Sequence, residues 1–335
     1  MFLFFTLFLY PYGAASLANG DVTAVQMHAL LSLRGMVSDP FGSLLSWNSS
    51  NHPCKWRGVG CSRKHAGRIV ELNLNSLGLI GGISPLLANL SYLRVLDLGE
   101  NQLRGHIPSD LGHLRRLRVL NLTMNSLQGS IPTSLRGCTQ LTKLILARNQ
   151  LHGEIQGELG ALRNLAILKL QTNALSGKIP SSLGNMSSLL ILSLSNNSLS
   201  GMIPASLGNL PNLRQIFLSQ NRLSGAIPSS LGRLSNLVSL DLEVNSLTGT
   251  IPSPIWNISS LVGFSVRDNK LTGTIPPNAF NDLPLLELLF MGNNKFHGDL
   301  PSSLTNATSL VQFEHFFFDT TPPTHQWSRL KDTLS

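Results

Sequence analysis

Apolar and polar residues alternate along the chain in a pattern that returns every 24 residues. Each return fits the frame LxxLxLxxNxLxGxIPxxLGxL, as in the segment LRVLDLGENQLRGHIPSDLGHL. Ten such units are readable between about residues 69 and 309. So many units in phase predict a repeat protein, in which each unit stacks on the next and no second core is needed. The frame asparagine stands at Asn101, Asn125, Asn149, Asn173, Asn197, Asn221, Asn245, Asn269 and Asn294.

Each position of the frame has a predicted structural role. The alternation in Leu96-Asp97-Leu98 is that of a short strand with its leucines facing inward, so the repeats predict a parallel sheet with one strand per unit. The frame asparagine is expected to turn the chain inward and to bond backbone groups inside the turn. The following glycine allows a tight bend, and the Ile-Pro pair then ends strand pairing. The glycines are Gly81, Gly105, Gly129, Gly153, Gly177, Gly201, Gly225, Gly249, Gly273 and Gly298.

The residues before the repeats predict a helical cap. Thr23-Ala-Val-Gln26 has the pattern of a capping box at a helix start. The residues after it supply one apolar helical face, formed by Met27, Leu30, Leu31 and Leu33. A helix here would cover the first repeat, which otherwise exposes its core.

Two of the three cysteines are expected to pair. Cys54 and Cys61 lie close enough in CKWRGVGC to form a disulfide. Zinc is the alternative, although two thiols without a paired His or Cys nearby make a poor site. Cys138 takes the slot that Leu114 and Leu162 fill in neighbouring units. It is therefore predicted to be buried, as a small apolar side chain.

The two ends of the chain differ from the repeats. An apolar stretch, Phe2 to Tyr10, precedes small residues, which predicts a signal peptide cleaved after Ala18. A membrane anchor is the rival interpretation, but Pro11 interrupts the stretch early. An eleventh unit begins near residue 310 and then loses the frame. We expect a signal peptide (1–18), a cap (19–68), ten repeats (69–309), and an imperfect eleventh repeat with an irregular tail (310–335).

The segment ALLSLRGMVSDPFGSLLSWNSSNHPCKWRGVGC and the LxGxIP repeats resemble the ectodomain of plant leucine-rich-repeat receptor kinases, in particular the class of flagellin and bacterial-peptide receptors. The resemblance covers about residues 20 to 310. It implies an α/β solenoid, namely a right-handed superhelical leucine-rich-repeat solenoid of about ten 24-residue plant-type repeats, with a parallel concave sheet and an N-terminal helical cap. It also implies that the concave side captures an extracellular peptide or protein ligand, with a co-receptor ectodomain as a possible further partner.

Such receptors continue into a membrane helix and a Ser/Thr kinase, so the full-length relative would lie in the plasma membrane. This sequence contains no Gly-rich phosphate loop, HRD or DFG. We interpret it as an ectodomain cut short before those parts, secreted and without a membrane span. Two alternatives stay open: a free secreted inhibitor of cell-wall hydrolases, similar to polygalacturonase inhibitors, and a structural solenoid without a ligand. The closing cysteine pair that the inhibitor would need is absent.

Motifs for catalysis are missing from the sequence. No HxxH or HExxH pair and no GxSxG occurs, so neither an enzyme, a metal site nor a cofactor is expected. The net charge of +8 hints at acidic partners. However, the tightest basic cluster, Arg115, Arg116 and Arg118, has no interleaved aromatic residue. We interpret it as a solvated face and do not predict nucleic-acid binding.

Ligand contacts are predicted on outward positions of the concave strands. In units seven to ten these positions combine two phenylalanines, expected to be exposed, with charges of both signs, which suits peptide recognition. The residues are Phe217, Asp241, Glu243, Arg267 and Phe290. The alternative is that Glu243 and Arg267 simply pair across neighbouring strands. Units four and five offer a second, more basic patch: Lys143, Arg148 and Lys169.

Seven Asn-x-Ser/Thr sequons are candidate glycosylation sites in a secreted chain. They lie at Asn48, Asn89, Asn121, Asn185, Asn196, Asn257 and Asn306. Asn121 points outward from the strand of unit three, and Asn196 lies beside the asparagine ladder in unit six. Glycans at these two positions would obstruct the concave face locally.

Overall fold

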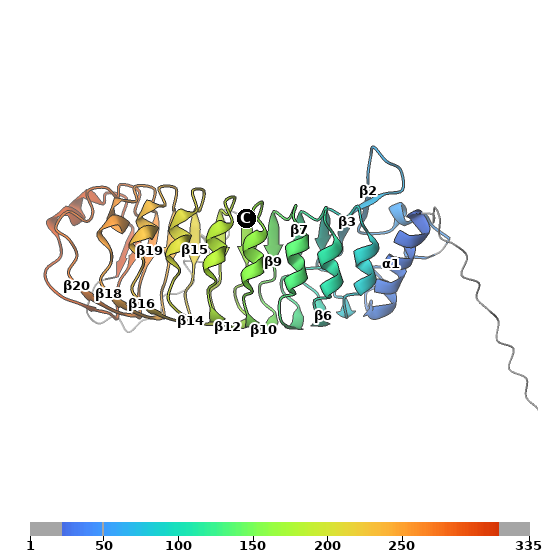
Figure 1. Ribbon diagram of the computed structural model, residues 1–335, viewed down its shortest axis with the longest axis horizontal. Helices are drawn as coiled ribbons and strands as arrows, with labels where there is room; N and C mark the ends of the chain where they lie inside the picture. The colour runs from blue at the N-terminus through green and yellow to red at the C-terminus, as the bar shows by residue number, and fades with distance from the viewer. Residues whose placement is uncertain (1–21, 49, 315–335) are drawn as a thin grey trace, which may run out of the picture.

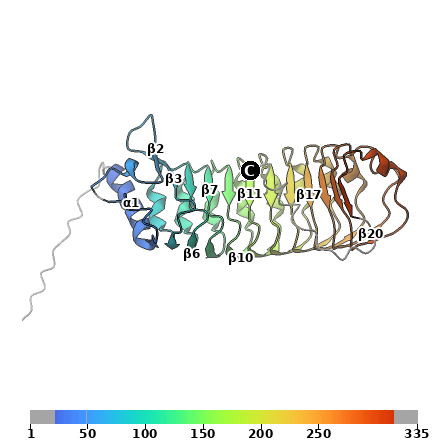
Figure 2. The ribbon, with the colours of Figure 1, turned by 180° about the vertical axis from the view of Figure 1, so that it is seen from behind.

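The computed structural model describes residues 22–48 and 50–314, and these form one elongated solenoid. Figures 1 and 2 show its two long sides, with 3-10 helices facing the viewer in the first view and strands in the second. A typical repeat contributes one strand to a first sheet, one strand to a second sheet and one 3-10 helix. The predicted signal peptide and the tail from residue 315 lie outside the described residues.

The predicted parallel sheet is present, and we call it the concave sheet. Leu72, Leu96 and Leu120 are register partners on three successive strands, so the sequence period equals the strand-to-strand register. Strand β2 (Val59–Cys61) pairs antiparallel with β3 (Ile69–Asn73), and the later pairings are parallel. The other strands are β5 (Val95–Asp97), β7 (Val119–Asn121), β9 (Lys143–Ile145), β11 (Ile167–Lys169), β13 (Ile191–Ser193), β15 (Gln215–Phe217), β17 (Ser239–Asp241), β19 (Gly263–Ser265), β21 (Leu288–Phe290) and β23 (Gln312–Glu314).

A second sheet forms where the sequence predicted only a bend. The LxGxI segments pair with one another in parallel, beginning beside a short antiparallel strand, β1 (Val37–Ser38). Each glycine does bend the chain, with φ of 83° at Gly105 and 82° at Gly129, but pairing continues up to it. The strands are β4 (Ile80–Gly81), β6 (Gln102–His106), β8 (Ser126–Gly129), β10 (Gln150–Glu154), β12 (Ala174–Lys178), β14 (Ser198–Gly201), β16 (Arg222–Gly225), β18 (Ser246–Gly249), β20 (Lys270–Gly273) and β22 (Lys295–Phe296).

Short 3-10 helices form the third side of the solenoid. They follow the Ile-Pro pairs, and leucines such as Leu111 and Leu114 are fully buried beneath them, as the frame predicted. The helices are η1 (Pro53–Lys55), in the cap, and η2 (Pro85–Asn89), η3 (Ser109–His113), η4 (Thr133–Gly137), η5 (Gly157–Ala161), η6 (Ser181–Asn185), η7 (Ala205–Asn209), η8 (Ser229–Arg233), η9 (Ser253–Asn257) and η10 (Ser302–Asn306).

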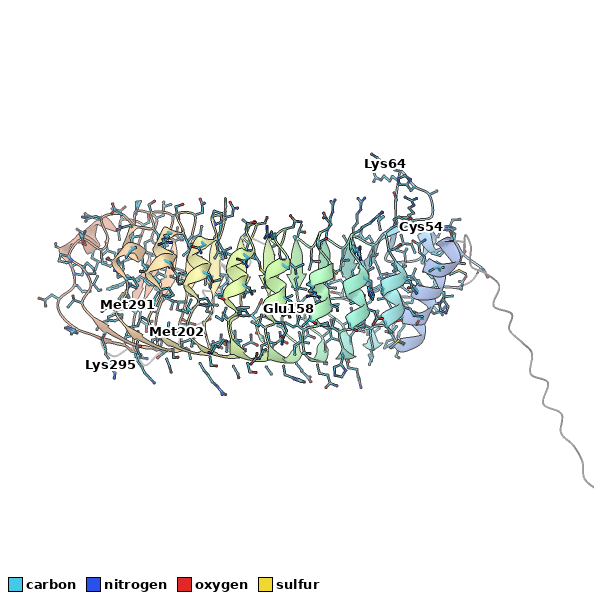
Figure 3. The ribbon with its side chains drawn as sticks, in the orientation of Figure 1. Cys54, Lys64, Glu158, Met202, Met291 and Lys295 are labelled. Carbon is cyan, nitrogen blue, oxygen red and sulfur yellow. A yellow bond between two sulfur atoms is a disulfide. The ribbon has the colours of Figure 1, made fainter. Side chains whose placement is uncertain are left out.

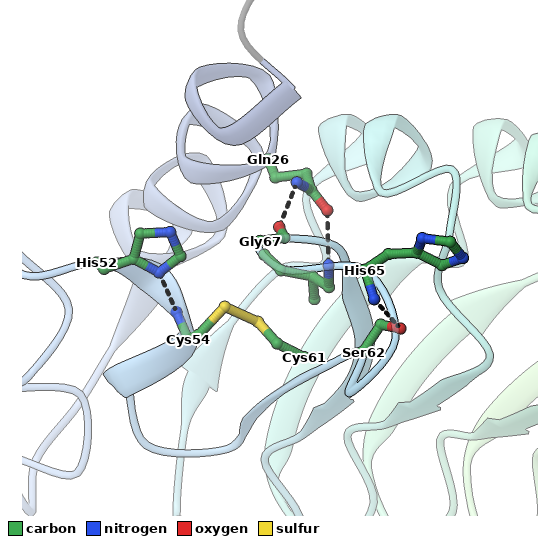
Figure 4. Close-up of a disulfide and its surroundings, with 8 residues drawn as sticks. Gln26, His52, Cys54, Cys61, Ser62, His65 and Gly67 are labelled. Atoms are coloured by element: carbon green, nitrogen blue, oxygen red, sulfur yellow. Dashed lines mark hydrogen bonds between the residues drawn. A yellow bond between two sulfur atoms is a disulfide. The ribbon is translucent and has the colours of Figure 1, made fainter.

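The predicted cap helix is α1 (Val22–Met36), which packs on the first repeat. Its Leu30 and Leu33 are at most 1% exposed. The helix already includes Val22, so Thr23 lies in its first turn and is not the N-cap residue. The Gln26 side chain joins the cap to the sheet: Nε2 donates to the Gly67 carbonyl (3.0 Å), and Oε1 accepts from the Ile69 amide (2.8 Å; Figure 4).

The asparagine ladder is confirmed. Asn197 Nδ2 donates to the carbonyls of Leu170, Leu194 and Ser195, and its Oδ1 accepts from the Leu175 amide. The residue before each of the nine ladder asparagines has a left-handed backbone, with φ between 49° and 58°, and so does Ser76, which precedes Leu77 in the first unit. The frame gave no sign of this second requirement, because residues as different as Arg148 and Val244 occupy the position.

The Cys54–Cys61 disulfide is present, with the two Cα atoms 5.6 Å apart (Figure 4). It closes the loop that leads into β2. We expect the C54S/C61S variant to lose about 2.5 kcal/mol of unfolding free energy, because a loop this short restricts the unfolded chain only modestly. Denaturant unfolding of both proteins measures the loss. An unchanged stability would show that the bond does not constrain the fold.

Cys138 is fully buried, as predicted, and burial raises the pKa of its thiol to about 11. Its Sγ lies 3.3 Å from the Leu111 carbonyl. Because the thiolate is the reactive form, iodoacetamide at pH 8 should leave Cys138 unmodified in the native protein and modify it after denaturation. Peptide mass spectrometry distinguishes the two. Rapid modification of the native protein would contradict the assignment.

Candidate ligand-binding surface

The outward positions of the concave sheet change in accessibility along the solenoid. On β5, β7, β9 and β11 both flanking residues of each strand are half-buried or exposed, and only the central leucine is buried. On β13, β15, β17 and β19 all three residues are buried. Strand β3 of unit one is open in the same way, so the longest accessible run of the concave sheet lies in units one to five.

Phe217 and Phe290 lie in the predicted outward column, but they are not exposed as expected. They are 2% and 3% exposed and form one apolar cluster, with Leu288 packed against it. Asp241 and Ser265 separate them in register, and both are smaller. The alternation of a strand gives the direction of a side chain but not what packs on it, which is why the expected exposure was wrong.

The charged residues of this region are also less accessible than expected. Asp241 is 1% exposed, and it accepts a hydrogen bond from Ser219 Oγ (2.6 Å). Arg267 is 7% exposed, and its Nε lies 3.2 Å from Asp268 Oδ2 and 3.3 Å from Glu314 Oε1. Half-buried Glu243 accepts from Ser265 Oγ (3.2 Å). Arg267 thus pairs with carboxylates on its own turn and on β23.

The second predicted patch is accessible. Lys143 is exposed at the start of β9, and Lys169 is half-buried at the end of the neighbouring β11. Arg148 is exposed in the left-handed position after β9, at the C-terminal edge of the sheet. The structure therefore brings the three cations of units four and five to one part of the concave face.

Four of the seven sequons share one place in the fold. Asn89, Asn185, Asn257 and Asn306 are each the last residue of a 3-10 helix, and all four are exposed. Glycans there would stand on the 3-10 side, away from the concave sheet. The structure leaves two sequon side chains half-buried, Asn48 and Asn121, and exposes Asn196 in the left-handed position of unit six. Asn121 Nδ2 donates to Asp97 Oδ1 (3.0 Å), across two concave strands.

The sequence reading missed a polar network on the concave sheet. Ser195, Ser219 and Asp241 come from three successive units, and the two hydroxyl oxygens lie 2.9 Å apart. Aligning the units in register would have placed these residues side by side. It would not have shown that all three are buried.

Comparison with family models agrees with this architecture. A model described as "Leucine-rich repeat region" matches residues 74–246, and "Leucine rich repeat N-terminal domain" matches residues 24–62. A further "Leucine Rich Repeat" model matches residues 236–258. The chain therefore belongs to the leucine-rich-repeat family, with the N-terminal cap of that family.

The similar proteins include plant receptor kinases. The LRR receptor-like serine/threonine-protein kinase EFR of Arabidopsis thaliana is 43% identical over 84 residues, which are 24% of this chain and 8% of that protein. The Arabidopsis receptor kinase HAESA, solved with the peptide hormone IDA and the co-receptor SERK1, is 31% identical with a TM-score of 0.61, over 81% of this chain and 54% of that chain. A plant ice-binding protein is 29% identical with a TM-score of 0.73, over 83% of this chain and 89% of that chain.

The matched region is a small part of the curated receptor kinases. The chain spans a tenth or less of the first curated relatives.

Across residues 22–48 and 50–314, no helix is long and apolar enough to cross a membrane. Within the same ranges, no group of three or more His, Cys, Asp or Glu side chains is placed to hold a metal ion.

Proposed function

We propose that this chain is the ligand-binding part of an extracellular receptor and that it binds a peptide on the concave sheet. The observation that carries the proposal is the open, basic part of that sheet in units four and five. Lys143 and Lys169 stand there on neighbouring strands and flank the buried leucine row. A continuous sheet of parallel strands with accessible polar positions suits an extended ligand that crosses many strands.

The comparisons support this proposal over the alternatives. HAESA, which shares the fold along most of this chain, was solved with a peptide hormone and a co-receptor. The ice-binding relative shows that the fold by itself does not decide function. We infer an extracellular location for the chain, consistent with its disulfide. A co-receptor ectodomain is the further partner we propose.

The predicted contact residues divide into two sets. Lys143, Arg148, Lys169 and Glu243 are exposed or half-buried, with Lys143 and Arg148 exposed. The buried residues contact a ligand only if the cluster around them opens; they are Phe217, Asp241, Arg267 and Phe290. We therefore place the first contacts of the peptide in units four and five.

The test uses a phage-displayed library of random 12-residue peptides, panned on the secreted glycoprotein. At about 3.3 Å per residue, against a strand spacing of about 4.8 Å, such a peptide crosses about eight strands. We expect enriched peptides to lose about tenfold or more in affinity for the K143E/K169E variant, because two opposite charges become like charges.

The matched control is R136E/R163E, which makes the same charge change on the 3-10 side of the neighbouring units three and four, where both arginines are exposed. Its affinity for the peptides should stay within about twofold of the wild type. Equal losses in both variants would show that net charge alone governs binding. Failure to enrich any peptide would favour the structural solenoid.

A further inference from the structure

A cluster of cations forms at the N-terminal edge of the concave sheet, away from the patch in units four and five. We call it the basic rim and define it as Arg63, Lys64, Arg68, Arg94, Arg116 and Arg118. The first three belong to the loop between β2 and β3, and the others come from the next two repeats. Arg68 is half-buried and the other five are exposed. In Figure 3 the loop carries Lys64 outward beyond the body of the solenoid.

The repeat places these cations in ordered columns. The amide of Arg94 donates to the Val70 carbonyl (2.7 Å), and the amide of Arg118 donates to the Arg94 carbonyl (2.8 Å). Arg94 and Arg118 are therefore the same frame position on neighbouring strands, about 4.8 Å apart along the solenoid. Two residues earlier in the frame, Arg68 and Arg116 flank Tyr92 in a second column.

Tyr92 holds two like charges close together. The Arg68 guanidinium carbon lies 4.4 Å from the ring centroid, and that of Arg116 lies 4.7 Å from it. One arginine comes from the repeat before Tyr92 and the other from the repeat after it. Stacking on the ring orders both guanidinium planes and leaves their N–H edges available to a ligand.

No carboxylate in the described part of the chain forms an ion pair with a rim cation. Both ion pairs among residues 22–48 and 50–314 belong to Arg267, far along the solenoid, so the six rim cations have no carboxylate partner there. Beside Arg94 a recess of about 410 Å³ opens, lined also by Arg63 and Lys64. Exposed cations around a recess, beside two arginines held on the Tyr92 ring, are an arrangement that binds anions.

We propose that the basic rim binds an acidic polysaccharide, a linear chain of uronate sugars. Such a chain carries one carboxylate on each sugar, and the rim repeats its cations at each strand step. Five of the six cations are arginines, whose planar fork matches a carboxylate with two parallel hydrogen bonds. The proposal shares with peptide binding only the extracellular location, and it uses a different surface.

Other partners fit the rim less well. Base stacking on single-stranded nucleic acid needs an open aromatic face, and a guanidinium lies on each side of Tyr92. A protein partner would bind an apolar anchor at the centre of the interface. None of the exposed large apolar side chains falls within residues 62–70, 92–94 or 115–118.

The experiment measures binding of the secreted glycoprotein to immobilised polygalacturonate at low and at physiological salt. The R94E/R118E variant should bind about tenfold or more weakly than the wild type. It reverses two of the six rim charges, both in the column that Arg94 and Arg118 form. The matched control is R214E/R233E. Arg214 holds the same frame position as Arg94 but stands five repeats further along, away from the rim. This control should stay within about twofold of the wild type.

Polygalacturonate whose carboxylates are methyl-esterified should not bind, since it keeps the sugar chain and loses the charge. Equal binding to the esterified chain, or equal losses in both variants, would overturn the proposal. Tighter binding to double-stranded DNA or to phosphatidylserine vesicles than to polygalacturonate would overturn it in favour of that partner. The K143E/K169E variant should keep its affinity for polygalacturonate, so a failure of the peptide proposal leaves this test intact.

Discussion

Replacing Asn101 by alanine is expected to lower the free energy of unfolding by about 3–5 kcal/mol, because each buried backbone group left without a partner costs about 1–3 kcal/mol. The side chain is 8% exposed. Its Nδ2 donates to the carbonyls of Leu74 (2.8 Å), Leu98 (3.0 Å) and Gly99 (2.8 Å), and its Oδ1 accepts from the amides of Leu77 (3.2 Å) and Leu79 (2.9 Å). Alanine removes all of these partners at once.

The control is Asn164→Ala, in which the asparagine is exposed and donates once, to the Thr139 carbonyl (2.9 Å). That variant should change stability little, as surface substitutions do. Asn101→Asp separates the two roles of the amide, because a carboxylate still accepts from Leu79 but cannot donate to three carbonyls. Urea unfolding followed by circular dichroism measures all three variants. A loss for N101A no larger than that for N164A would contradict the ladder.

Replacing Gly208 by alanine should cost about 3 kcal/mol or more. A Cβ built at Gly208, in η7, would lie 2.2 Å from the Ser230 carbonyl oxygen and 2.5 Å from the Ser230 carbonyl carbon. Both atoms belong to the backbone of the next unit, so a rotamer change cannot relieve the contact and the 3-10 helices must move apart. Overpacking of this kind usually costs about 1–3 kcal/mol, and a backbone clash belongs at the upper end.

Gly105→Ala is the matched comparison, because it tests backbone conformation without crowding. Gly105 has φ of 83°, yet its Cβ would meet nothing within 4 Å. A left-handed backbone costs a non-glycine residue about 1–2 kcal/mol. Thermal and denaturant unfolding should therefore rank G208A as less stable than G105A. The opposite order would mean that the spacing between units is not set by this glycine.

The sequence predicted the repeat but only part of its cross-section. The leucines alternate within each strand and recur every 24 residues, so they determine both the strand and its register. Each leucine equivalent to Leu96 pairs with the leucine at the same position of the next unit. The second sheet was missed because QLRGH has one inward apolar residue, too few to show a strand period. The role of Gly208 was missed for another reason. The frame contains the glycine, but the atom it would strike belongs to the following unit.

The candidate sites show the same limit. Outward direction at Phe217 follows from strand alternation. Its burial, and its place in one cluster with Phe290 and Leu288 about 70 residues away in the chain, do not follow from that alternation. The sequence shows Arg116 and Arg118 only as part of a local basic cluster, interpreted as a solvated face. It does not show the rim, because Arg68, Arg94 and Arg118 are separated by about one repeat each. Only stacking the units places them side by side, next to a loop that no repeat pattern predicts.

Photo-crosslinking of a selected peptide is the most direct test of ligand capture on the concave sheet. A peptide enriched against the purified protein would carry one benzoylphenylalanine at its centre, and mass spectrometry would locate the residue to which it attaches. The structure predicts attachment to outward positions of β7, β9 and β11, around Lys143 and Lys169. Attachment to the 3-10 helices η4 and η5, on the opposite side of the same units, would contradict it.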